Sequence, residues 1–92
     1  MVRVHLTRHL FAFFPQLEAR EIAVDATDVA GVIRALEDLA PGIGFYLCDE
    51  RGRLRPHVNV FIGNAIIRDR RLLGDPVADG DKVSILQALS GG

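Results

Sequence analysis

Cysteine is almost absent from this sequence, which limits its redox and cluster chemistry. Cys48 is the only cysteine among the 92 residues, so no disulfide can form within the chain, and an iron–sulfur cluster held by four cysteines is excluded. The acidic pair Asp49-Glu50 follows Cys48 directly and disfavours its thiolate. We therefore interpret Cys48 as a small hydrophobe rather than as a sulfur relay.

Long apolar runs, lysine and basic blocks are also scarce. No run approaches the ~20 residues of a membrane span, and Met1–Leu6 alternates like a strand rather than resembling a signal peptide. Lys82 is the only lysine, and a net charge of −1 without a basic block lacks the electrostatic footprint of general nucleic-acid binding. We expect a cytoplasmic protein with no membrane or nucleic-acid partner.

The spacing of the apolar residues predicts the main elements of secondary structure. Strands are expected at residues 2–6, 20–24, 57–62, 65–67 and 83–86. A helix is expected to begin after the N-cap Asp28, with Thr27 as the alternative cap, and to end before Pro41-Gly42. Its apolar stripe consists of Val29, Val32, Ile33, Leu36 and Leu39.

Two further segments have no clear period. Thr7–Pro15 is expected to be a loop whose three phenylalanines, Phe11, Phe13 and Phe14, fill one end of the core, with partner contact as the alternative. Ile43–Leu47 is expected to form a short turn of helix.

One amphipathic helix can cover one face of one sheet, which predicts a single α+β domain with two layers. If the first and last strands lie side by side in the middle, they run parallel. The fold is then a β-grasp, or ubiquitin-like, fold: a mixed sheet with one main helix packed on one face. We assign residues 1–86 to this domain and residues 87–92 to a flexible C-terminal tail.

The tail ends on Gly91-Gly92 and carries the free carboxylate of Gly92. Glycine has no Cβ, so such an end is thin, and the stretch from Gln87 to Gly92 reaches roughly 20 Å when extended. That length can bring the carboxylate deep into another protein's active site. Small residues also collect at chain ends without a function, so the dipeptide alone leaves both interpretations open.

Three stretches together resemble one known family. Residues 54–64, Leu-Arg-Pro-His-Val-Asn-Val-Phe-Ile-Gly-Asn, are similar to its "LRPxVNxFVN" strand and turn. Residues 78–86 are similar to its "xDGDxVxIL" segment, and Gly91-Gly92 matches its terminus. On these residues the chain resembles the small ubiquitin-like sulfur carriers of molybdopterin, thiamine and cysteine synthesis. It departs from them at Gln87, where the family often has proline, and at Ser90, where it often has alanine.

The resemblance implies a protein cosubstrate rather than an enzyme, with no catalytic residue, no metal and no bound cofactor. A separate adenylating enzyme would use ATP to convert the Gly92 carboxylate to an acyl-adenylate. A sulfur donor enzyme would then displace AMP and leave a thiocarboxylate on Gly92. A downstream synthase would accept that sulfur in cofactor or cysteine biosynthesis. On its own the chain is expected to be a monomer.

Partner contacts are expected beside the tail and on one strand. Leu86, Leu89 and Ser90 flank the terminus, where an enzyme that takes the tail would bury the two leucines. Phe61 lies on the strand face opposite Val58, Val60 and Ile62. It is therefore either an exposed docking anchor or a side chain packed under the aromatic loop.

The remaining polar residues give no catalytic set. His5, His9 and His57 are scattered and are interpreted as structural or surface histidines rather than metal ligands. Arg68, Arg70 and Arg71 either steer an acidic partner or form a solvated edge that guards the sheet.

Alternative functions share the same terminus. Within the sulfur carriers, residues 54–64 are closer to the cysteine-type carrier than to the small subunit of molybdopterin synthase. A ubiquitin-like modifier conjugated to lysines through Gly92 would use the same activation chemistry. A plain β-grasp binding module would make no use of the tail at all.

Overall fold

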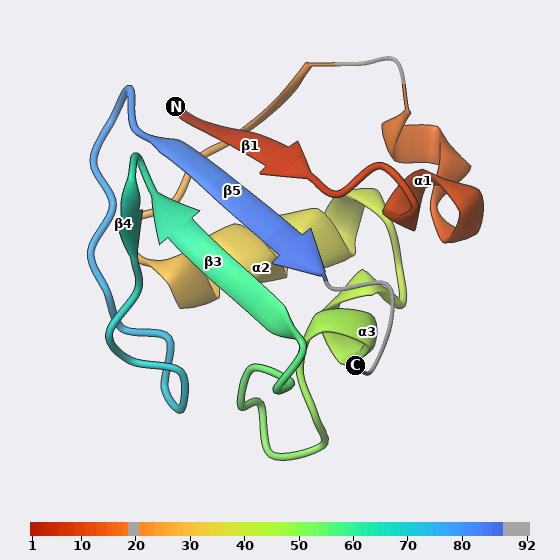
Figure 1. The fold of residues 1–92 in the computed structure, drawn as a ribbon. Coiled ribbons are helices and arrows are strands. Elements are labelled where there is room, and N and C mark those ends of the chain that lie inside the picture. The colour runs from red at the N-terminus through yellow and green to blue at the C-terminus, as the bar shows by residue number, and fades with distance from the viewer. Residues whose placement is uncertain (19–20, 88–92) are drawn as a thin grey trace.

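The computed structural model describes residues 1–18 and 21–87, and in it a sheet is covered on one face by the helix α2 (Figure 1). The elements in chain order are β1 (Val2–Leu6), α1 (Leu10–Phe13), the 3₁₀ turn η1 (Pro15–Leu17), β2 (Ile22–Val24), α2 (Val29–Leu39), α3 (Ile43–Leu47), β3 (Val58–Ile62), β4 (Ala65–Ile66) and β5 (Lys82–Gln87). None of the helices in the described ranges is long and apolar enough to cross a membrane.

The described strands form one mixed sheet in the order β2-β1-β5-β3-β4. β1 and β5 run parallel in the middle, whereas β1–β2, β3–β5 and β3–β4 are antiparallel. The first and last strands are therefore neighbours, which confirms the predicted α+β class and β-grasp topology. The parallel register places Leu6 beside Ile85, so β1 and β5 finish at the same end of the sheet.

The helix α2 begins and packs largely as the sequence predicts. The Asp28 side chain accepts a hydrogen bond from the Gly31 N–H at 2.7 Å, which confirms it as the N-cap. The apolar stripe is buried from Val29 to Leu36, but Leu39 is 37% exposed, so its assignment to the core was wrong. The helix ends at Leu39, and the next residue, Ala40, is fully buried in its place.

The segment expected to be an aromatic loop is helical instead. The Phe14 N–H donates to the Leu10 carbonyl at 2.9 Å and closes α1, after which Pro15 starts η1 at a position where its missing N–H costs nothing. Phe14 is buried and Phe11 packs against the core, but Phe13 is 60% exposed. The three rings therefore do not all fill the core.

A carboxylate joins α2 to α3. Glu37 accepts hydrogen bonds from the Gly42 N–H at 2.9 Å and from the Gly44 N–H at 2.8 Å, and both bonds lower its pKa. Gly42 has φ 102°, a left-handed conformation that favours glycine, so the chain can turn sharply between the helices. This contact fixes the position of α3, which lies near the end of β5 (Figure 1).

Candidate functional site at the end of the last strand

The last described residue, Gln87, is tied to the sheet by a side chain. The Thr7 N–H donates to the Ile85 carbonyl at 3.1 Å, which continues the parallel pairing of β1 and β5. The Thr7 carbonyl then turns to accept from Leu10 at 3.0 Å, as α1 begins. The Thr7 hydroxyl instead accepts from the Gln87 N–H at 2.7 Å. The Thr7 hydroxyl therefore replaces the Thr7 carbonyl as the acceptor for β5, and it keeps β5 bonded to β1 as far as Gln87.

Two more contacts surround Gln87. His9 Nε2 lies 3.2 Å from Gln87 Oε1, and on the opposite side Val58 of β3 is in antiparallel register with Gln87. β5 is thus held on both edges at the point where residues 88–92 begin. We call this point, Gln87 with Thr7 and His9, the tail root. β5 spans Lys82–Gln87, so the strand extends one residue further at each end than the expected residues 83–86.

A hollow of about 400 Å³ adjoins the tail root. Its lining residues are Phe45, Tyr46, Arg55, His57 and Gln87. Arg55 donates from Nε and Nη2 to the Phe45 carbonyl, at 3.1 and 2.9 Å, and its guanidinium lies 5.0 Å from the centre of the Phe45 ring. The hollow therefore combines a fixed cation with an aromatic surface, a frequent composition of protein interfaces.

The site residues predicted from the sequence fall into two groups. Gly91, Gly92, Leu89 and Ser90 lie outside the described residues. Leu86 and Phe61 lie on the face of the sheet that α2 does not cover, which we call the open face.

On the open face the apolar side chains are close neighbours. Leu86 is 44% exposed and pairs with Asn59, whereas Phe61 is half-buried and pairs with Ser84. Leu86 and Phe61 are therefore diagonal neighbours, about 7–8 Å apart by standard strand geometry. Ile66, 51% exposed and paired with Phe61, extends the same apolar surface toward β4.

The other candidate residues have structural or surface positions. Cys48 is buried, and that burial, helped by the Asp49 carboxylate, raises the pKa of its thiol, which confirms its interpretation as a small hydrophobe. His5 and His57 are exposed. Within residues 1–18 and 21–87, no three His, Cys, Asp or Glu side chains are grouped so that they could hold a metal ion.

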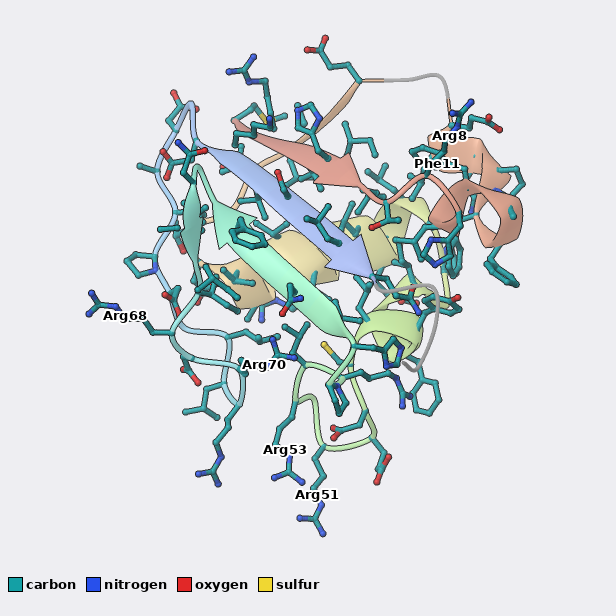
Figure 2. The ribbon with its side chains drawn as sticks, viewed as in Figure 1. Arg8, Phe11, Arg51, Arg53, Arg68 and Arg70 are labelled. Atoms are coloured by element: carbon teal, nitrogen blue, oxygen red, sulfur yellow. The ribbon has the colours of Figure 1, made fainter. Side chains whose placement is uncertain are left out.

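The arginines of the predicted charged edge differ from one another. Arg70 donates from Nη2 to the carbonyls of Arg55 and Val58, at 2.7 and 2.8 Å, and is half-buried. It fastens the loop after β4 to the start of β3, so its assignment to a solvated edge was wrong. Arg68 and Arg71 are exposed, and Figure 2 shows Arg68 pointing away from the body of the molecule.

Sequence reasoning missed Thr7 and Arg55. Thr7 contacts Gln87 across 80 positions of the chain, and no local pattern marks such a contact. The one available signal was its place directly after the alternating residues 2–6, because a hydroxyl at a strand end often replaces a backbone hydrogen-bonding group. Arg55 lies inside the recognised Leu-Arg-Pro stretch, but only the fold brings it beside the tail root.

The chain is similar to proteins of one known family. The ThiS family model matches residues 9–92. "Sulfur carrier protein CysO" of Mycobacterium tuberculosis is 32% identical over 75 residues, which cover 79% of this chain and 81% of that protein.

Solved structures agree over the full length. A chain in the crystal structure of the Amycolatopsis orientalis BexX/CysO complex matches with a TM-score of 0.83 and 26% identity, covering 100% of both chains. The crystal structure of Mycobacterium tuberculosis CysO matches with a TM-score of 0.82 and 28% identity, covering 97% of this chain and 100% of that one.

Proposed function

The chain belongs to the ThiS family of ubiquitin-like sulfur carriers, and we propose on this premise that its Gly92 carboxylate is adenylated and then converted to a thiocarboxylate. As a sulfur carrier of this family it is a protein substrate rather than an enzyme. The chemistry is then supplied by partner enzymes, and the chain supplies a reactive end and the surfaces that present it.

The observation that supports this proposal best is the tail root. Thr7, His9 and Val58 hold Gln87 in place, and the five residues that follow it end in Gly-Gly. Five extended residues span about 17 Å, a suitable length for a chain end that enters an active site while the folded domain stays outside. A fixed root also limits the directions in which the tail leaves the domain.

The proposed steps balance without a redox partner. A carboxylate oxygen of Gly92 attacks the α-phosphorus of ATP, and pyrophosphate leaves. A sulfide-level sulfur then attacks the acyl carbon, and AMP departs with that oxygen. The product carries sulfur in place of one carboxylate oxygen and is a stronger nucleophile than the carboxylate. No side chain of the described residues is required in these steps.

The open face supplies a docking surface next to this tail. Leu86 is the last open-face residue before the tail root, and Phe61 and Ile66 continue its apolar surface. An enzyme that takes the tail comes against β5 first and buries Leu86. The adenylating enzyme, the sulfur donor and the acceptor synthase all need the same end of the chain, so we propose that they use this surface in turn.

We further propose that the sulfur is delivered to cysteine synthesis. The similarity to proteins described as CysO sulfur carriers and the closeness of residues 54–64 to the cysteine-type carriers support this choice. The BexX/CysO complex also supports the expectation that a carrier of this fold binds a partner protein stably enough to crystallise with it.

The experiment is an intact-mass measurement after incubation of the full chain with ATP, sulfide and a ubiquitin-activating-type adenylating enzyme from the same genome. We expect a mass gain equal to the exchange of one oxygen for one sulfur. Attachment of the chain to lysines of other proteins, with no such gain, would support the modifier function instead. An unchanged mass, with an enzyme shown to be active on another carrier, would contradict both.

A further inference from the structure

We propose that the hollow beside the tail root is a second docking point, which receives an acidic side chain of the enzyme that takes the tail. The hollow is lined by Phe45, Tyr46, Arg55, His57 and Gln87. The inference rests on the proposed function, because it assumes that a partner enzyme binds the tail. It adds a contact, separate from the open face, that selects the partner by charge.

The hollow lies where an enzyme that takes the tail comes nearest to the folded domain. An enzyme that binds residues 88–92 must approach Gln87, and Gln87 is itself part of the hollow's wall. The surface beside Gln87 is formed by α3 and by the segment leading into β3. A partner that covers the tail root therefore also covers Arg55 and Phe45.

The chemistry of the hollow favours a carboxylate. None of the described residues that line it is acidic, and Arg55 contributes a permanent positive charge, which the Asp49 carboxylate outside the lining offsets only in part. The Phe45 carbonyl accepts from both Nε and Nη2 of Arg55, at 3.1 and 2.9 Å, so the guanidinium is already oriented. Within the described residues Nη1 has no hydrogen-bond partner, and its N–H groups are available to an incoming oxygen. An oriented cation loses little freedom when a partner binds.

The exposed ring of Phe45 beside Arg55 should strengthen the binding of a partner at the hollow. Phe45 is 64% exposed although its ring is large and apolar, and it lies against the Arg55 guanidinium. Aromatic and arginine side chains dominate the energetic centres of interfaces, and a charge pair shielded from water by a ring is stronger than one on an open surface. The exposed ring is thus explained as a surface that the partner covers.

The proposed contact uses the charge of Arg55 and not the charges of the other arginines nearby. Figure 2 shows Arg51 and Arg53 on the neighbouring turn, pointing away from the body of the molecule. Arg51 is exposed and does not line the hollow. It therefore offers a matched control, because Arg51→Gln removes the same charge a few residues from the proposed contact.

The test measures the steady-state kinetics of pyrophosphate release, with the adenylating enzyme that modifies the wild-type chain and with the carrier as the varied substrate. We expect Arg55→Gln to raise KM about tenfold and to leave kcat within about twofold, because the lost contact binds ground state and transition state alike. Arg51→Gln should leave KM within about twofold. The wild-type KM should rise between about 25 and 300 mM NaCl, and that of Arg55→Gln should rise less.

A second variant protects the test from effects on folding, since Arg55→Gln also removes the hydrogen bonds to Phe45. Phe45→Ala truncates an exposed ring, and we expect it to raise KM severalfold while the urea unfolding midpoint stays near that of the wild type. Arg55→Lys keeps the charge but not the planar fork, and should recover part of the loss.

Four results would overturn the proposal. Equal KM values for Arg55→Gln, Arg51→Gln and wild type would show that the hollow contacts no partner. A faster reaction of Arg55→Gln would show that the hollow competes for the chain's own carboxylate. Retention of the wild type by poly(U) RNA, lost in Arg55→Gln without a kinetic change, would assign the hollow to nucleic acid. Failure of the wild type to release pyrophosphate would overturn the proposed function along with this contact.

Discussion

The two faces of the central sheet are built from alternate residues of the same strands, yet they have opposite character. Val4, Val60 and Ile85 point toward α2 and are at most 5% exposed. Leu86 and Phe61 point to the open face, where Leu86 is 44% exposed and Phe61 half-buried. Because side chains alternate along a strand, moving one residue along β5 passes from the core to a surface available to partners.

This comparison separates stability from recognition. The covered face stabilises the fold by removing apolar area from water, and the open face leaves apolar area in water, where only a partner can bury it. The tail root lies where both functions meet, since Gln87 belongs to the sheet and the residues after it reach the partner. Substitutions on the covered face should therefore change stability, and substitutions on the open face should change partner binding.

The strongest contrast is between neighbouring residues of β5. We expect Ile85→Ala to lower the free energy of unfolding by about 3 kcal/mol, because it leaves a cavity in the core, and Leu86→Ala to lower it by less than about 1 kcal/mol. Urea unfolding monitored by circular dichroism measures both values. Equal losses would show that the open face also stabilises the isolated domain.

The reverse contrast concerns partner binding. We expect Leu86→Asp to raise the KM of adenylation about tenfold, equivalent to about 1.4 kcal/mol, while it changes stability little. Asn59→Asp is the matched control, because it places a negative charge on the residue paired with Leu86 and removes no apolar surface. If both variants had the same KM, charge rather than the apolar surface would govern docking.

The tail root is tested by its threonine. Thr7→Val removes the acceptor for the Gln87 N–H and should cost about 1 kcal/mol of stability, because a backbone donor loses its partner. Hydrogen exchange of the Gln87 amide should become faster, and Thr7→Ser, which keeps the hydroxyl, should restore slow exchange. Unchanged exchange in Thr7→Val would contradict a fixed root.

The smallest expected effect is a pH-dependent change in stability, which comes from the contact of Glu37 between α2 and α3. The pKa of Glu37 is lowered by the N–H groups of Gly42 and Gly44, so its contact stabilises the fold above the ordinary value of 4.5. That stabilisation is lost as the pH falls through the lowered pKa of the folded state. We expect Glu37→Gln to lower the urea midpoint at neutral pH and to match wild type in acid.

The control is Asp38→Asn, which removes the same charge at the next position of α2. It separates the specific contact from the change in net charge. A deficit of Glu37→Gln that stayed constant from neutral pH to acid would contradict the assigned cause.

Much of this architecture follows from local sequence patterns. The alternation of residues 2–6 and 58–62 and the N-cap Asp28 each depend on neighbours in the chain, so they were predictable. The terminal glycines and the motif of residues 54–64 led to the family. These features determine which face of each strand is buried, and with it the open face.

The rest depends on contacts across long separations. Thr7 and Gln87 meet only because β1 and β5 are parallel neighbours, and Arg70 reaches Val58 only because the loop after β4 folds back on β3. The short helix α1 has no long apolar period, and a single turn is stabilised by its packing rather than by propensity. Leu39 fits the helical spacing but falls at the last residue of α2, where the chain turns away and Ala40 is buried instead.

A single reaction mixture tests whether Gly92 is the reactive end of the chain. The full chain and a chain lacking Gly92 are combined in equal amounts with ATP, sulfide and the adenylating enzyme, and both intact masses are followed over time. We predict that only the full chain exchanges one oxygen for one sulfur, because only its carboxylate reaches the α-phosphate. Equal exchange in both chains, or exchange in neither while the enzyme modifies another carrier, would contradict the claim that Gly92 is the reactive end.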